Sequence, residues 1–307
     1  MSAEDFINPY PGLRPFRFEE SYLFFGREGQ SEELLKRLER SHFVAVVGTS
    51  GSGKSSLVRA GLLPLLSSGF MPNTGADWRI AILRPGNSPI HNLARALVLP
   101  EQYTGGAPTS ANKASDELNI GITETILRRS AIGLLDYADS GELAKGENLL
   151  VVVDQFEELF RFKKEYGQSE SDEAAAFVKL LLEATRDKST RDKKKSPVYV
   201  VITMRSDFLG DCAQFRDLPE AINDGQYLIP RLTREQLRQV IESPAKIHGA
   251  QMSPVLVTNL LNDIGDDQDQ LPVLQHALMR TWNEWAKKEN QDAEISYHDY
   301  ESSNNLK

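Results

Sequence analysis

The residues with the clearest chemistry form a turn of glycine and serine directly behind an apolar stretch, residues 43–47. Backbone N–H groups of such small residues can converge on phosphate oxygens at the start of a helix, because no Cβ atoms stand in the way. Lys54 would reach the β- and γ-phosphates, and Ser55 would place a hydroxyl on Mg²⁺. The pattern predicts a P-loop that binds a nucleoside triphosphate, and the alternative is a glycine-rich turn without a ligand. The predicted phosphate-binding residues are Gly48, Thr49, Ser50, Gly51, Ser52, Gly53, Lys54, Ser55 and Ser56.

A second apolar run, residues 149–153, ends in an acidic residue. Successive Val and Leu residues predict a parallel strand that is buried on both faces. Asp154 follows this strand, as the acid of a Walker B motif does, and is the predicted Mg²⁺ ligand beside Ser55. Glu157 and Glu158 follow within one turn, and we favour Glu158 as the base that polarises water, with Glu157 on the metal side. The alternative is a buried strand followed by a solvated acidic turn.

Three more apolar runs predict further strands at residues 79–83, 198–205 and 227–229. The first lies between the two motifs along the chain, and an extra strand of this kind marks the additional-strand P-loop ATPases. Arg205 ends the second run and matches the sensor position of that class, where a polar side chain contacts the γ-phosphate or the attacking water. Arg205 is therefore the third predicted catalytic residue. The alternative is an ion pair with Asp207 or Asp211.

The order of these patterns predicts the domain organisation. Residues 31–231 alternate helix and strand signals and predict an α/β fold, a three-layer P-loop core around a five-stranded parallel sheet. Residues 1–30 form an N-terminal lead. A stretch rich in Gly, Pro, Ser and Thr, residues 100–119, predicts a surface insertion. A small helical domain is predicted over residues 232–300, from helical patterns near 233–247, 253–263 and 271–288.

Composition excludes several classes of protein. The formal net charge of −9 argues against a protein that coats nucleic acid with its whole surface, so nucleic acid is an unlikely partner. The single cysteine, Cys212, excludes an internal disulfide and a Cys-based zinc site. No apolar run approaches the ~18 residues of a membrane span, so we expect a cytoplasmic protein without a membrane partner. The basic segment 186–195 predicts a solvated loop, with a contact site for a polyanion or partner as the alternative.

Several short motifs then occur in order and together resemble the novel STAND NTPase group of bacterial multidomain signalling proteins. The motifs are Asn-Pro-Tyr-Pro-Gly-Leu-Arg-Pro-Phe at 8–16, Phe-Gly-Arg-Glu at 25–28, the P-loop with its continuation to residue 64, Leu-Arg-Pro-Gly at 83–86, Asp-Gln-Phe-Glu-Glu at 154–158 and Leu-Pro-Val-Leu at 271–274.

This resemblance implies an AAA-type core followed by a helical lid and a winged helix, of which residues 301–307 would be the truncated start. Gly26, Arg27 and Glu28 match the family's upstream motif near the nucleotide, so Gly26 and Arg27 are expected to contact the nucleotide, although Gln30 stands where an acid is usual. Pro272 matches a lid proline that packs on the adenine. The alternative for Pro272 is the first-turn proline of a helix, where its ring is pre-organised.

The resemblance also implies a function. The chain would be a molecular switch that binds ATP or ADP with Mg²⁺ and slowly hydrolyses ATP. It would thereby control oligomerisation of its own protomers and activation of an effector, in bacterial defence or signal transduction. Sensor and effector domains would lie beyond Lys307 or on partner chains. Two alternatives are an AAA-type remodelling or loading ATPase with sustained turnover, and a nucleotide-stabilised scaffold without hydrolysis.

Overall fold

The computed structural model describes residues 8–71, 74–100, 113–160, 168–186, 196–264, 270–288 and 294–304. The chain divides into two compact units. We call Glu32–Gly48 with Leu65–Ile229 the sheet unit, and Met1–Ser31 with Thr49–Pro64 and Pro230–Lys307 the helical unit. Most of the predicted basic loop at 186–195 and the last residues of the predicted winged helix lie outside the described residues.

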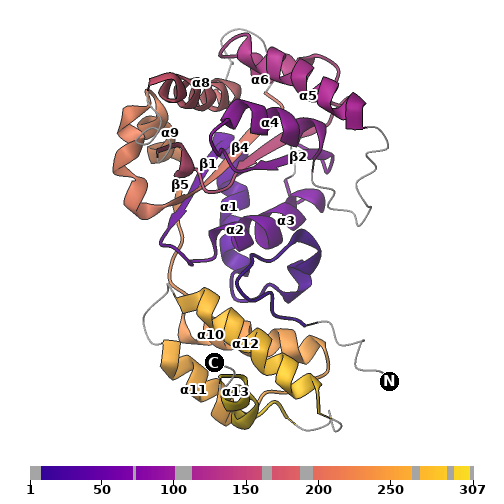
Figure 1. Cartoon of the computed structure of the whole chain (residues 1–307), viewed down its shortest axis with the longest axis vertical. Helices are drawn as coiled ribbons and strands as arrows, with labels where there is room; N and C mark the ends of the chain where they lie inside the picture. Colours follow the sequence, from indigo (N-terminus) through magenta and orange to yellow (C-terminus); the bar gives the residue numbers. More distant parts are fainter. Residues whose placement is uncertain are drawn as a thin grey trace. The chain divides into compact units, whose positions relative to one another are not determined.

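The sheet unit is built on five parallel strands in the order β2-β3-β4-β1-β5 (Figure 1). The predicted five-stranded parallel sheet is therefore confirmed. Along the chain, β2 lies between the glycine turn after β1 and Asp154 after β3. In the sheet, however, β2 forms the edge, and β4 lies between β1 and β3. The strands are β1 Phe43–Gly48, β2 Trp78–Leu83, β3 Asn148–Val153, β4 Val198–Arg205 and β5 Gln226–Leu228.

The strands are rich in Val, Ile and Leu because both faces of the sheet are covered. All six residues of β1 are buried, as are the last five of β3. The register aligns Val153 with Ile202 and Gly48 with Arg205. The carboxyl ends of β1, β3 and β4 therefore lie at the same edge of the sheet.

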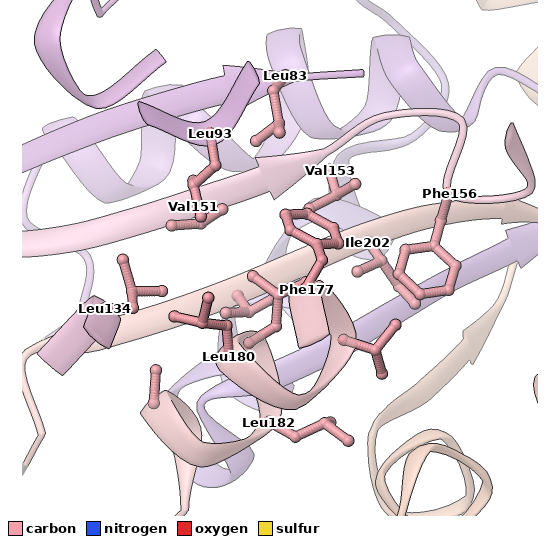
Figure 2. Close-up of a cluster of buried hydrophobic side chains, with 14 of the residues drawn as sticks. Leu83, Leu93, Leu134, Val151, Val153, Phe156, Phe177, Leu180, Leu182 and Ile202 are labelled. Carbon is pink, nitrogen blue, oxygen red and sulfur yellow. The ribbon is translucent and has the colours of Figure 1, made fainter. Parts of the chain in front are cut away.

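One face of the sheet packs on helices through the apolar cluster of Figure 2. There Val151 and Ile202 of the strands meet Leu93, Leu134 and Phe177 of three helices. Each fully buried side chain of this size contributes about 1.5–3 kcal/mol relative to an exposed one, so the cluster stabilises the layer strongly. The helices of this unit are α4 Pro89–Val98, α5 Lys113–Arg128, α6 Gly133–Asp139, α8 Gln168–Thr185 and α9 Leu218–Gly225, with 3₁₀ turns at Ser206–Phe208 and Gly210–Gln214.

Helix α1, Glu28–Ser41, covers the other face. Its Leu34 is fully buried, and the guanidinium of Arg37 lies 5.5 Å from the ring centre of Tyr227. Tyr227 pairs with Val46, whereas Val47 belongs to the same apolar cluster as Val151, so alternation along the strand assigns α1 to the opposite side. The three layers predicted from the sequence are present.

Part of the surface insertion predicted over residues 100–119 is helical in the structure. Helix α5 begins at Lys113 and buries Ile120 and Leu127. Only residues 101–112 of the predicted insertion lie outside the described part of the chain. Composition averaged over the whole stretch hid the helical period that starts at its end.

The helical unit holds the P-loop, the lead and the four C-terminal helices (Figure 1). Trp282 and Trp285 are almost fully buried among the C-terminal helices and form the centre of their core. Thr233 caps the first of these helices by accepting from the N–H of Gln236, which the Gln236 side chain reciprocates. None of the described helices is both long and apolar enough to span a bilayer. The elements are a 3₁₀ turn Phe18–Leu23, α2 Lys54–Ser56, a π-helical stretch Leu57–Leu62, α3 Leu63–Ser67, α10 Arg234–Ile247, α11 Pro254–Ile264, α12 Leu271–Ala286 and α13 Tyr297–Asn304.

Candidate functional site

The turn after β1 has the backbone that a phosphate cradle requires. Gly51 has φ 73° and Gly53 has φ 86°, in the left-handed region that costs an L-residue about 1–2 kcal/mol. A Cβ atom on Gly53 would meet nothing within 4 Å, so conformation rather than space demands glycine there. Helix α2 begins at Lys54 with Gly53 as its N-cap. Glycine has no side chain that could accept hydrogen bonds from the first N–H groups of the helix. Helix starts of this kind are common anion-binding sites.

Hydrogen bonds within the loop hold this turn together. The ammonium of Lys54 donates to the carbonyl of Thr49 at 2.6 Å, and the hydroxyl of Ser52 donates to the same carbonyl at 2.9 Å. The Ser56 hydroxyl accepts from the N–H of Phe16 at 3.2 Å, so it also anchors the N-terminal lead. The loop thus keeps its cationic side chain close to the glycine turn.

Asp154 lies directly after β3 and is 3% exposed. The hydroxyl of Thr203 in β4 donates to its Oδ1 at 2.6 Å and accepts from the N–H of Gln155 at 3.1 Å. Thr203 therefore orients the carboxylate as a partner behind a metal ligand would. Thr203 was not predicted from the sequence. The available signal was its hydroxyl in an otherwise apolar stretch, residues 200–204.

The two neighbouring glutamates lie in different surroundings. Glu157 is 6% exposed, and its Oε2 accepts from the N–H of Arg205 at the end of β4, at 3.4 Å. The Oε2 of Glu158 accepts from the N–H of Gly86 at 3.0 Å, in the loop after the edge strand β2. Because Arg205 is aligned with Gly48, Glu157 lies beside the strand next to β1, whereas Glu158 faces the far edge of the sheet.

Arg205 forms a local ion pair. Its guanidinium donates to both carboxylate oxygens of Asp207, at 3.1 and 2.6 Å, and lies 5.6 Å from the ring centre of Phe208. This is the alternative considered for Arg205 from the sequence. Its role as a sensor stays a prediction.

Arg27 contacts the P-loop, and Gly26 packs against helix α10. Gly26 has φ 82°, and a Cβ atom there would lie 2.8 Å from the carbonyl oxygen of Gln236 in α10. Arg27 is 3% exposed and donates to the carbonyls of Ser52 and Pro230, both at 3.0 Å. These contacts of Arg27 are to protein oxygens.

Pro272 lies in the first turn of α12, as a structural helix-start proline would. Three and four residues further on, Gln275 and His276 share its face of the helix. Within the described part of the chain, Gln275 Oε1 and His276 Nδ1 are buried without a hydrogen-bond partner, as is Trp282 Nε1. An unsatisfied buried polar group costs about 1–3 kcal/mol. These atoms are enclosed by protein, and His276 Nδ1 would lie 3.9 Å from a Cβ atom on Gly12. The residues present fit the phosphates of a nucleotide, through the glycine turn and Lys54.

The lead is tied to the C-terminal helices by polar contacts, one of which is buried. The Tyr10 hydroxyl donates to the carbonyl of Ile241 in α10 at 2.5 Å, and its ring meets Trp282 edge-on. Burial raises the pKa of Tyr10 above its usual range, with a smaller contribution from the charge of Glu242, so the hydroxyl stays a donor. Asn8 donates to the carbonyl of Met279 in α12 at 2.8 Å.

Gly26→Ala should destabilise the protein by about 2 kcal/mol or more, because its Cβ would enter the contact with Gln236 and its φ is left-handed. Gly29→Ala, three residues on, is the matched control. Gly29 lies in α1 with nothing within 4 Å of an added Cβ, so alanine should stabilise by up to about 1 kcal/mol. Urea unfolding measures both variants. Equal stability of Gly26→Ala and the parent protein would show that the contact with α10 is not tight.

Comparisons with known proteins agree with this fold. The family model described as Novel STAND NTPase 1 matches residues 9–307. No curated protein sequence matches the chain. A solved structure of the Aeropyrum pernix ORC2 protein, in ADPNP-ADP complexes, is 14% identical with a TM-score of 0.55, covering 98% of this chain and 70% of that one. A chain of the E. coli MS115-1 HORMA:CdnC:Trip13 complex is 13% identical with a TM-score of 0.57. This match covers 100% of this chain and 97% of that one.

The Aeropyrum pernix ORC1 protein in complex with DNA is 15% identical with a TM-score of 0.53. The match covers 92% of this chain and 65% of that one. At such identities the likeness shows the fold alone.

Proposed function

The chain belongs to the Novel STAND NTPase 1 family and is a P-loop NTPase; from this premise we propose that it is a molecular switch. In this proposal it binds ATP or ADP with Mg²⁺, hydrolyses ATP slowly, and exists in an inactive state while ADP is held. Exchange for ATP releases the helices α10–α13 and permits self-association. The same change activates an effector in bacterial defence or signal transduction.

The observation that carries the proposal is that two strands end at the same edge of the sheet: β1, which leads into the left-handed glycine turn, and β3, which leads into the oriented, buried Asp154. The N–H groups of the turn and Lys54 would hold the phosphates, while Ser55 and Asp154 would hold Mg²⁺. When bound, ATP supplies the phosphoanhydride bond that is hydrolysed. Thr203 keeps one oxygen of Asp154 engaged, so the carboxylate would be presented to Mg²⁺ in one orientation.

We assign the general base to Glu157, although the sequence favoured Glu158. The support is that Glu157 is held at the end of β4, beside the strand that leads into the P-loop, whereas Glu158 is held by Gly86 at the opposite edge. A buried carboxylate at that position takes a proton from the attacking water. Arg205, at the same strand end, would exchange Asp207 for the γ-phosphate and report its presence.

Pro272, Gln275 and His276 are proposed to meet the base of the nucleotide from α12. Support comes from their common face and from the buried polar atoms of the last two. Moving a switch from nearly all open to nearly all closed requires about 5.5 kcal/mol of preference for one state. A base contact together with the phosphate contacts can supply a difference of this size.

The partners proposed are other protomers of the same chain and sensor or effector domains on partner chains or elsewhere in a longer protein, in the cytoplasm. One similar chain was solved within a HORMA:CdnC:Trip13 complex, which is compatible with a fold that assembles. The proposal is tested by identifying the nucleotide that the protein retains after gentle purification and by measuring steady-state ATP hydrolysis. We expect retained ADP and slow turnover. Rapid sustained turnover would instead indicate a remodelling ATPase, and binding without any hydrolysis a scaffold.

The α12 contact gives a second test. Pro272→Ala should speed ADP release and weaken the protection that ADP gives to the amides of residues 271–285 in hydrogen exchange. Pro254→Ala, the first-turn proline of α11, is the matched control and should leave ADP binding unchanged. If ADP protects residues 271–285 equally in both variants and the parent, Pro272 is a helix-start residue only.

A further inference from the structure

Arg27 joins three separate parts of the helical unit through one buried guanidinium. Nη1 donates to Gln30 Oε1 at 2.6 Å and to the carbonyl of Pro230 at 3.0 Å. Nη2 donates to the carbonyl of Ser52 at 3.0 Å. A planar guanidinium presents its donors in fixed directions, so the positions of these oxygens depend on one another.

The bond to Ser52 acts on the phosphate cradle. The peptide bond between Ser52 and Gly53 is trans, so the Ser52 carbonyl and the Gly53 N–H point in opposite directions in one plane. Holding the carbonyl on Arg27 therefore aims the Gly53 N–H to the other side. Without this bond the peptide could rotate at little cost, because Gly53 has no Cβ atom to restrict its φ angle.

The bond to Pro230 acts on the connection to the C-terminal helices. Pro230 follows β5, and the capped helix α10 begins four residues later. Gly26, next to Arg27, packs on the carbonyl of Gln236 in the first turn of the same helix. Residues 26 and 27 thus contact the P-loop on one side and the start of α10 on the other.

We propose that Arg27 is a positioning residue that aims a P-loop N–H and couples nucleotide occupancy to the segment entering α10. A phosphate that binds the Gly53 N–H fixes the Ser52–Gly53 peptide and strengthens its bond to Arg27. The guanidinium then holds the Pro230 carbonyl in place. The inference rests on the proposed function, because it concerns the regulation of that same site. It differs from the role expected from the sequence, in which Arg27 touches the nucleotide itself.

The test compares Arg27→Lys and Arg27→Gln with the parent, and Arg40→Gln on the exposed end of α1 serves as the control. Calorimetry with Mg·ADP measures affinity, and hydrogen exchange of residues 231–237 at saturating ADP measures coupling. In the parent and in Arg40→Gln, ADP should slow exchange of these amides. In Arg27→Lys, which keeps the charge but cannot span the acceptors, affinity should fall about tenfold or more and the ADP-dependent protection should disappear.

Gln30→Ala gives a second test that does not depend on the folding of Arg27→Lys, because it keeps Arg27 and removes only the side chain that orients it. It should show a smaller loss of protection in the same direction. Protection of residues 231–237 that is as strong in Arg27→Lys and Gln30→Ala as in the parent, at saturating ADP, would overturn the inference. A parent protein that does not bind ADP would instead overturn the proposed function, so the two failures are distinguishable.

Discussion

Lys54→Ala is expected to lose ATP binding in the micromolar range. The ammonium is the P-loop's positive charge, and each charge-assisted hydrogen bond that it would give to a phosphate contributes about 1.5–3 kcal/mol. Loss of about 3 kcal/mol corresponds to a fall in affinity of about 150-fold. In the folded protein, the side chain makes an exposed bond to the Thr49 carbonyl, so stability should change little.

Calorimetric titration with Mg·ATP measures the affinity, and thermal unfolding without nucleotide checks the fold. Lys36→Ala is the matched control, because Lys36 lies on the exposed side of α1. That variant should bind as the parent does. Micromolar affinity retained by a folded Lys54→Ala protein would remove the phosphate-binding assignment of the loop.

Glu157→Gln is expected to lower the rate of ATP hydrolysis by about 10²–10⁴-fold, the usual contribution of a general base. Glutamine keeps the size of the side chain and its acceptor for the Arg205 N–H, but it cannot take a proton from water. Affinity for ATP should therefore stay within about threefold of the parent, because only the transition state is affected.

Glu158→Gln is the matched control at the adjacent position. It keeps the contact with the Gly86 N–H and should hydrolyse ATP at nearly the parental rate. Single-turnover hydrolysis and calorimetry on the same samples separate the chemical step from binding. A large loss of rate in Glu158→Gln together with a parental rate in Glu157→Gln would return the role of base to Glu158.

Local sequence patterns predicted most of the elements because they depend on residues close together in the chain. Apolar runs of Val, Ile and Leu marked all five strands, and the glycine turn behind residues 43–47 marked the P-loop. The helical period predicted α10, α11 and α12 with ends that differ by one or two residues from the structure. The capping pair Thr233 and Gln236 explains why α10 begins where it does.

The order of strands was not a local property. Residues 79–83 were correctly expected to form a strand, yet nothing within them states that β2 lies at the edge while β4 separates β1 from β3. This order decides which of two adjacent glutamates lies near the P-loop strand. The sequence therefore identified the pair Glu157 and Glu158, and the strand order separated them.

The sequence by itself was enough to predict a P-loop NTPase, since that prediction depends on residue types at fixed short spacing: small residues for the cradle, Lys54 for charge and an acid after a buried strand. The tertiary structure alone decided how these groups are held. The Thr203 hydroxyl reaches Asp154 across 49 positions, and Arg27 reaches Ser52 across 25 and Pro230 across 203. Bonds between residues so far apart leave no periodic signal in the chain, because they form only after strands and helices have packed.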